Sequence, residues 1–114
     1  TFGHALIATE DPAHLAEAEK VLRQAVGRDR ENPFAWTQLA TIYERKGDQP
    51  RVALAMAERA SLIGEPQMAL ASARAAVAGL PEGSSERLRA QDIQMIAQNE
   101  LDERKPNRRR LSAQ

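Results

Sequence analysis

The sequence predicts an all-α fold in which antiparallel helix pairs stack as a short right-handed superhelix, an α-solenoid of about six helices. Turn signals containing proline or glycine recur at similar intervals, apolar residues between them recur every three or four positions, and no segment alternates with period two. Of the 114 residues, 42% are hydrophobic but only 4% are aromatic. Such a core depends on the close approach of helices through small side chains.

Five turn signals mark where the predicted helices start and stop. They are Asp11-Pro12, Asn32-Pro33, Gly47-Asp48, Gly64-Glu65-Pro66 and Gly79-Leu80-Pro81. In the first two, the acidic or amide side chain can accept a hydrogen bond from a free backbone N–H, and proline suits the first helical position. The glycines of the other three suit the left-handed residue that ends many helices. We therefore expect helices between these signals.

One face of each expected helix is apolar. The opening residues, Thr1 to Ile7, are typical of the interior of a helix that began earlier, so we expect the chain to be part of a larger protein. The later faces, in chain order, are Leu15, Ala18, Leu22, Ala25 and Val26; Trp36, Leu39, Ala40 and Tyr43; Ala53, Met56, Ala57, Ala60 and Ile63; Ala69, Ala73, Ala76, Val77 and Leu80; and Ala90, Ile93, Ile96, Ala97 and Leu101. Each face needs a neighbouring helix to cover it.

One of these helices resembles the first helix of a tetratricopeptide repeat. The residues that carry the resemblance are Trp36, Leu39, Ala40, Tyr43 and Gly47, and the second-helix positions that follow are Ala53, Ala57 and Ala60, displaced by one inserted residue. The spacing from Gly47 to Gly64 is 17 residues, half of a unit of about 34. The resemblance implies a repeat domain over residues 1–103 with an irregular last unit.

A second resemblance covers most of the chain. Residues 3–12, 32–36, 80–84 and 88–93 are similar to the C-terminal region of BepA-like bacterial periplasmic zinc metallopeptidases. In that family an HExxH protease domain precedes a tetratricopeptide region. The resemblance implies a periplasmic location and protein or peptide partners, among them the parent's own protease domain and outer-membrane assembly proteins. Zinc would belong only to the missing protease domain.

Catalytic patterns do not occur in the sequence. There is no HExxH, His4 and His14 are ten residues apart, and cysteine is absent, whereas a zinc-protease helix needs two histidines at i and i+4. No serine stands in a nucleophile-elbow pattern and no glycine-rich phosphate loop occurs. We therefore expect neither an enzyme nor a cofactor or metal site in this segment.

The remaining candidate surface is a groove lined by the first helix of each pair. The register set by Trp36 and Tyr43 points five side chains into it, namely Phe34, Thr37, Thr41, Glu44 and Arg45. Phe34 could anchor a peptide or pack against the adjacent turn, and general burial preference favours packing. The two threonines argue against the lysine and asparagine clamp that some repeat proteins use to hold chaperone tails.

Charge is unevenly distributed. Residues 1–103 hold 11 basic and 16 acidic side chains, net −5, and residues 104–114 hold five basic ones, net +5. We expect this tail to be disordered and solvated. The alternative is that it contacts a membrane or a nucleic acid, and the negative charge of residues 1–103 argues against nucleic acid. The leading hypothesis is a partner-binding domain of a periplasmic protease. The alternative is a generic repeat scaffold in an envelope assembly or cytochrome-maturation factor.

Overall fold

The computed structural model describes residues 12–104, which form five α-helices: α2 (Pro12–Arg28), α3 (Pro33–Arg45), α4 (Gln49–Leu62), α5 (Pro66–Gly79) and α6 (Ser85–Glu103). No strand occurs in this range, so the predicted all-α class is confirmed. The number of helices is five rather than about six, since the helix expected near the beginning of the chain lies outside the described residues. Apart from Arg104, the predicted disordered tail also lies outside them.

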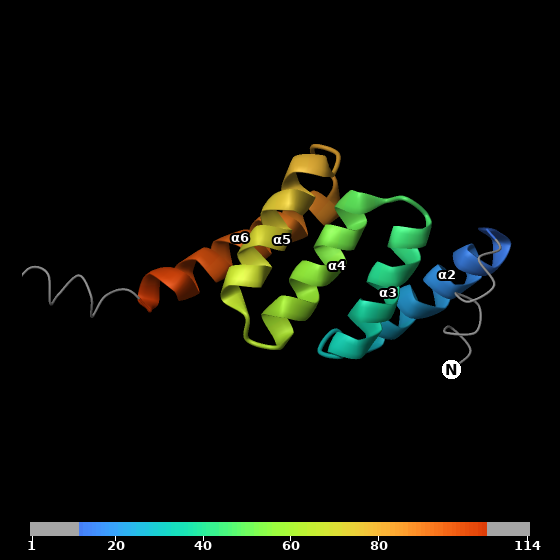
Figure 1. Ribbon diagram of the computed structural model, residues 1–114, viewed down its shortest axis with the longest axis horizontal. Helices are drawn as coiled ribbons and strands as arrows, with labels where there is room; N and C mark the ends of the chain where they lie inside the picture. Colours follow the sequence, from blue (N-terminus) through green and yellow to red (C-terminus); the bar gives the residue numbers. More distant parts are fainter. Residues whose placement is uncertain (1–11, 105–114) are drawn as a thin grey trace, which may run out of the picture.

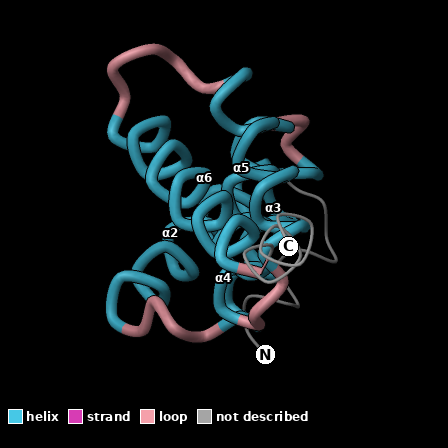
Figure 2. Tube along the Cα trace, turned by 90° about the vertical axis from the view of Figure 1, so that its left-hand side faces the viewer, coloured by secondary structure: helices cyan, strands magenta, loops and turns pink. Residues whose placement is uncertain are grey.

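The helices form two layers. Figure 1 shows α3, α4 and α5 side by side with alternating directions, while α2 and α6 pass behind them. In the perpendicular view of Figure 2, α2 and α6 lie on the same side of the molecule. Each helix packs against the next one in the chain, and α4 also contacts α6. The back of α4 therefore faces the space between α2 and α6.

The helix starts follow the predicted capping chemistry. Prolines begin α2 and α3, as expected. The side chain of Asn32 accepts hydrogen bonds from the backbone N–H groups of Phe34 and Ala35 at 3.1 and 3.3 Å. These bonds satisfy donors that have no partner within the first helical turn.

Glycine has two different roles in the turns. Gly47 and Gly64 have φ angles of 76° and 75°, as the predicted left-handed positions require. The same prediction for Gly79 is wrong: this residue is the last of α5, and Gly83 takes the positive φ of 82° in that connection. A Cβ atom on Gly79 would lie 2.6 Å from Cγ of Pro50. Glycine is needed there because α4 begins where α5 ends.

The core rests on alanine-mediated contacts, as the composition predicts. One cluster joins α2, α3 and α4 around Trp36, Leu39, Ala40 and Tyr43, which are all buried. Two others join α4, α5 and α6, and the alanines Ala57, Ala73, Ala76 and Ala90 have no exposed surface. Among the expected second-helix positions, Ala57 and Ala60 are buried and Ala53 is half-buried. Small side chains let the helices approach closely enough to exclude water.

Candidate functional site

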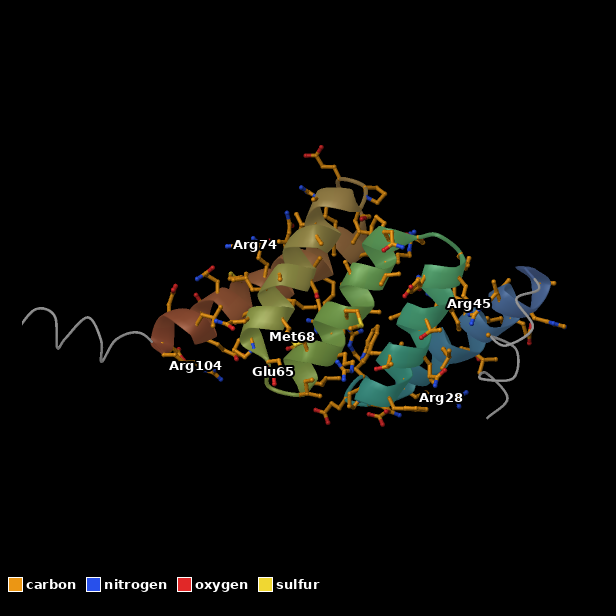
Figure 3. All side chains as sticks on the ribbon, in the orientation of Figure 1. Arg28, Arg45, Glu65, Met68, Arg74 and Arg104 are labelled. Atoms are coloured by element: carbon orange, nitrogen blue, oxygen red, sulfur yellow. The ribbon has the colours of Figure 1, made fainter. Side chains whose placement is uncertain are left out.

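The five predicted groove residues lie on one exposed or half-exposed face of α3. Phe34 is 60% exposed, so it does not pack against the adjacent turn as burial preference suggested. The hydroxyl groups of Thr37 and Thr41 donate to backbone carbonyls one turn earlier, at 3.0 and 3.1 Å. Glu44 and Arg45 are exposed in the last turn of the helix, and Figure 3 places Arg45 at the outer edge of α3.

A concave surface lined by aromatic and charged side chains lies elsewhere. A cleft of about 360 Å³ opens between α2 and α6, with its floor on α3 and α4. It is lined by Arg23, Val26, Gly27, Arg30, Trp36, Leu39, Tyr43, Arg51, Leu54, Ala55, Glu58, Ser85, Glu86 and Arg89. The five predicted groove residues are not among these. Their proposed role in partner binding stays a prediction for a different face of the molecule.

Two aromatic side chains form part of the floor. The indole Nε1–H of Trp36 donates to the backbone carbonyl of Arg30 at 2.9 Å, which fixes the orientation of the ring. Tyr43 is only 5% exposed. Its burial raises its pKa to about 12, and the nearby charges partly offset one another, since Arg23 lowers the pKa and Glu19 raises it. The phenol is therefore neutral at physiological pH.

The first of two charge networks centres on the buried carboxylate of Glu58, which is 4% exposed. Arg89 donates to both carboxylate oxygens, with Nη2 2.8 Å from Oε1 and Nε 2.9 Å from Oε2. Arg30 Nη2 donates to Oε2 at 3.1 Å, and its guanidinium carbon lies 6.0 Å from the centre of the Trp36 ring. The hydrogen bonds to Glu58 raise the pKa of Arg89. Glu58 thus joins α4 to α6 and to the turn after α2.

The second network centres on Glu86 of α6. Arg51 donates to both oxygens of Glu86 at 2.8 Å, and also to Asp48 at 2.8 Å. These hydrogen bonds raise the pKa of Arg51. Arg23 of α2 lies 3.6 Å from the same Glu86 and 3.4 Å from Glu19. This network therefore links α2, α4 and α6 around the cleft.

The cleft has a charge opposite to that of the rest of the body. Its lining holds four arginines and two glutamates, net +2. Residues 12–104 together hold 12 basic and 14 acidic side chains, net −2, so the remaining surface is net −4. No lysine is among the lining residues. Positive charge is thus concentrated in a concave site, where it attracts anionic groups most effectively.

Among residues 12–104, no group of three or more histidine, cysteine, aspartate or glutamate side chains is placed to hold a metal ion. No helix in the same range has the length and apolar character needed to cross a bilayer. Of the two histidines, His14 is exposed on α2 and His4 lies outside the described residues.

Sequence reasoning missed both charge networks. Their members were not singled out, because Glu58 and Glu86 each pair with an arginine more than 30 positions away. One local signal was available on α4. Arg51, Leu54, Ala55 and Glu58 recur at helical spacing and therefore share one face, where charges flank apolar positions. A charged residue on an apolar face indicates a buried ion pair.

The comparisons with known proteins returned no similarity. No protein-family model matches the chain, and neither a curated protein nor a solved structure matches it. The resemblance to tetratricopeptide repeats and to BepA-like metallopeptidases therefore rests on the quoted motifs alone.

Proposed function

We propose that this chain is a protein-interaction module of stacked helix pairs, which binds a segment of a partner protein in the cleft between α2 and α6. The observation that carries the proposal is the cleft itself. It combines an aromatic and aliphatic floor with arginines, and two non-consecutive helices form its walls. Tryptophan, tyrosine and arginine are the residues most enriched at protein-binding hot spots.

The size of the cleft suits side chains of a peptide. Its volume of about 360 Å³ lies near the lower end of the range for ligand pockets, about 300–1,000 Å³. The floor is already in place because Trp36 is fixed by its hydrogen bond to the backbone of Arg30. A rigid, preformed floor reduces the conformational entropy lost on binding.

The wider setting of the module is supported by the resemblance to BepA-like enzymes. In that setting, the parent protein is a periplasmic zinc protease, and the module brings substrates or assembly partners to its protease domain. The sequence upstream of Thr1 tests this part directly. An HExxH helix preceded by an export signal supports the protease, and the absence of an HExxH helix supports the generic repeat scaffold.

Gly27 offers a way to block the cleft without disturbing the fold. It lines the cleft from α2, and a Cβ atom at this position would have no heavy atom within 4 Å. The Gly27→Phe variant therefore adds an aromatic ring at the wall of the cleft, and Gly27→Ala is the matched control. Random 12-residue peptides displayed on phage are selected on the full 114-residue chain, and the selected peptides are synthesised and titrated.

We expect the selected peptides to bind wild type and Gly27→Ala with similar Kd values. Their Kd for Gly27→Phe should be at least tenfold higher. Circular dichroism shows whether all three proteins have the same helical content. If every selected peptide binds Gly27→Phe as tightly as wild type, the cleft is not the binding site and the proposal fails.

A further inference from the structure

We infer that the partner segment is acidic, with an aspartate or glutamate beside an apolar side chain, and that Arg23 and Arg30 bind its carboxylates. This inference rests on the proposed function, because it specifies which partner the cleft accepts. The evidence for it is that the four arginines lining the cleft, Arg23, Arg30, Arg51 and Arg89, differ in their hydrogen bonding.

Two of the four arginines already hold a carboxylate of this chain through two N–H groups each. Arg89 makes a two-pronged interaction with Glu58 at 2.8 and 2.9 Å, and Arg51 makes the same type of interaction with Glu86 at 2.8 Å. This fork geometry uses the guanidinium edge that best matches a carboxylate. Arg51 and Arg89 therefore hold the walls and floor together.

The other two arginines keep most of their hydrogen-bonding capacity. The side chain of Arg30 is 57% exposed and makes one hydrogen bond to a carboxylate, at 3.1 Å. The side chain of Arg23 is 52% exposed, and its contacts with Glu19 and Glu86 are longer, at 3.4 and 3.6 Å. A guanidinium has five N–H donors. Both residues can therefore donate hydrogen bonds to a carboxylate of a partner while keeping their present contacts.

The position of Arg30 explains why the acidic residue would have an apolar neighbour. Its guanidinium lies over the ring of Trp36, which also lines the cleft together with Leu39. A carboxylate bound to Arg30 is thus next to aromatic and aliphatic surface. Trp36 and Leu39 are only 7% and 2% exposed, so an adjacent apolar side chain of the partner covers little apolar area there. Its main effect is to exclude water from the ion pair, which strengthens it.

Charge also favours an acidic protein segment in the cleft over the chain's own tail or a nucleic acid. Residues 105–114 carry four basic and no acidic side chains, so the net positive cleft repels the chain's own tail. A nucleic acid would extend beyond the cleft over a body whose remaining surface is net −4. A short acidic segment of a protein matches the cleft without meeting that repulsion.

The test uses the peptides selected on the full chain. Each is titrated beside a version in which every aspartate and glutamate is replaced by asparagine and glutamine. The protein variants are Arg23→Gln, Arg30→Gln and the double variant. Arg74→Gln is the matched control, because Arg74 is exposed on α5 and its hydrogen bond to Gln98 is long, at 3.5 Å. Figure 3 shows Arg74 projecting from the edge of α5.

The inference expects the selected peptides to be net negative. Replacing the peptide's carboxylates by amides should weaken binding at least tenfold, and so should the Arg23→Gln/Arg30→Gln double variant of the protein. Arg74→Gln should bind the peptides as wild type does, and higher salt should weaken binding to wild type. Urea unfolding of each variant shows that the fold is retained. If selected peptides are neutral or basic but still lose affinity for Gly27→Phe, the cleft binds proteins and the acidic assignment is overturned. If Gly27→Phe has no effect, the proposed function itself fails.

Discussion

The same substitution at two helical glycines should have opposite effects on stability. At Gly79, an added Cβ would lie 2.6 Å from Cγ and 3.0 Å from Cβ of Pro50, whereas carbon atoms in contact are about 3.5–4.0 Å apart. The end of α5 and the start of α4 must therefore separate by roughly 1 Å in the Gly79→Ala variant. Overpacking of this kind costs about 1–3 kcal/mol.

The intrinsic helix preference of alanine offsets part of that cost, by about 0.5–1 kcal/mol. We therefore expect Gly79→Ala to lower the free energy of unfolding by about 1 kcal/mol, and by at most about 2.5 kcal/mol. At Gly27 an added Cβ meets nothing within 4 Å, so Gly27→Ala should raise the free energy of unfolding by about 0.5 kcal/mol.

Urea unfolding followed by circular dichroism and by the fluorescence of Trp36, the single tryptophan, measures both changes. The double variant Gly79→Ala/Pro50→Ala provides the control, since it removes the Cγ atom that the new methyl group meets. It should recover part of the lost stability. If Gly79→Ala stabilises the chain as much as Gly27→Ala does, the close approach of α4 and α5 described here is wrong.

Further predictions concern the cleft. Tyr43 has a pKa of about 12 in the folded state against 10.0 when unperturbed, so the unfolded state releases this proton first as the pH rises. The resulting stability is fully present below pH 10, and about 2–3 kcal/mol of it is lost between about pH 10 and 12. Urea midpoints across this pH range should fall less in Tyr43→Phe than in wild type. An equal fall in both proteins would contradict the raised pKa of Tyr43. The Arg89→Ala variant should lower the free energy of unfolding by about 2 kcal/mol, because it leaves the buried Glu58 with one partner. Arg74→Ala should change it by less than about 0.5 kcal/mol, and equal urea midpoints for the two alanine variants would show that the Glu58 network does not stabilise the fold.

Local chemistry made much of the fold predictable. The cap at Asn32 and the positive φ of Gly47 depend on a few adjacent residues, and both were predicted correctly. Gly79 was predicted wrongly because its role depends on Pro50, a residue 29 positions away on another helix. Sequence spacing does not show which parts of two helices touch, since their crossing is set by the packing of many small side chains.

The candidate site was less predictable for the same reason. The exposed face of α3 follows from the register of Trp36 and Tyr43, and the structure places Phe34, Thr37 and Thr41 on it. The cleft instead forms between α2 and α6, with its floor on α3 and α4, and its charge pairs join residues far apart in the chain. The local indication of it was on α4, where Arg51 and Glu58 share one helical face with the apolar Leu54 and Ala55.

The nuclear magnetic resonance signal of the Trp36 indole N–H tests the central claim most directly. Trp36 is the single tryptophan, its Nε1–H group donates to the carbonyl of Arg30, and both residues line the cleft. Binding of a selected acidic peptide to the ¹⁵N-labelled chain should shift this resonance and the backbone signals of Arg23, Gly27 and Arg89. An unchanged indole signal, with shifts confined to Phe34, Thr37 and Thr41 on the outer face of α3, would contradict the account.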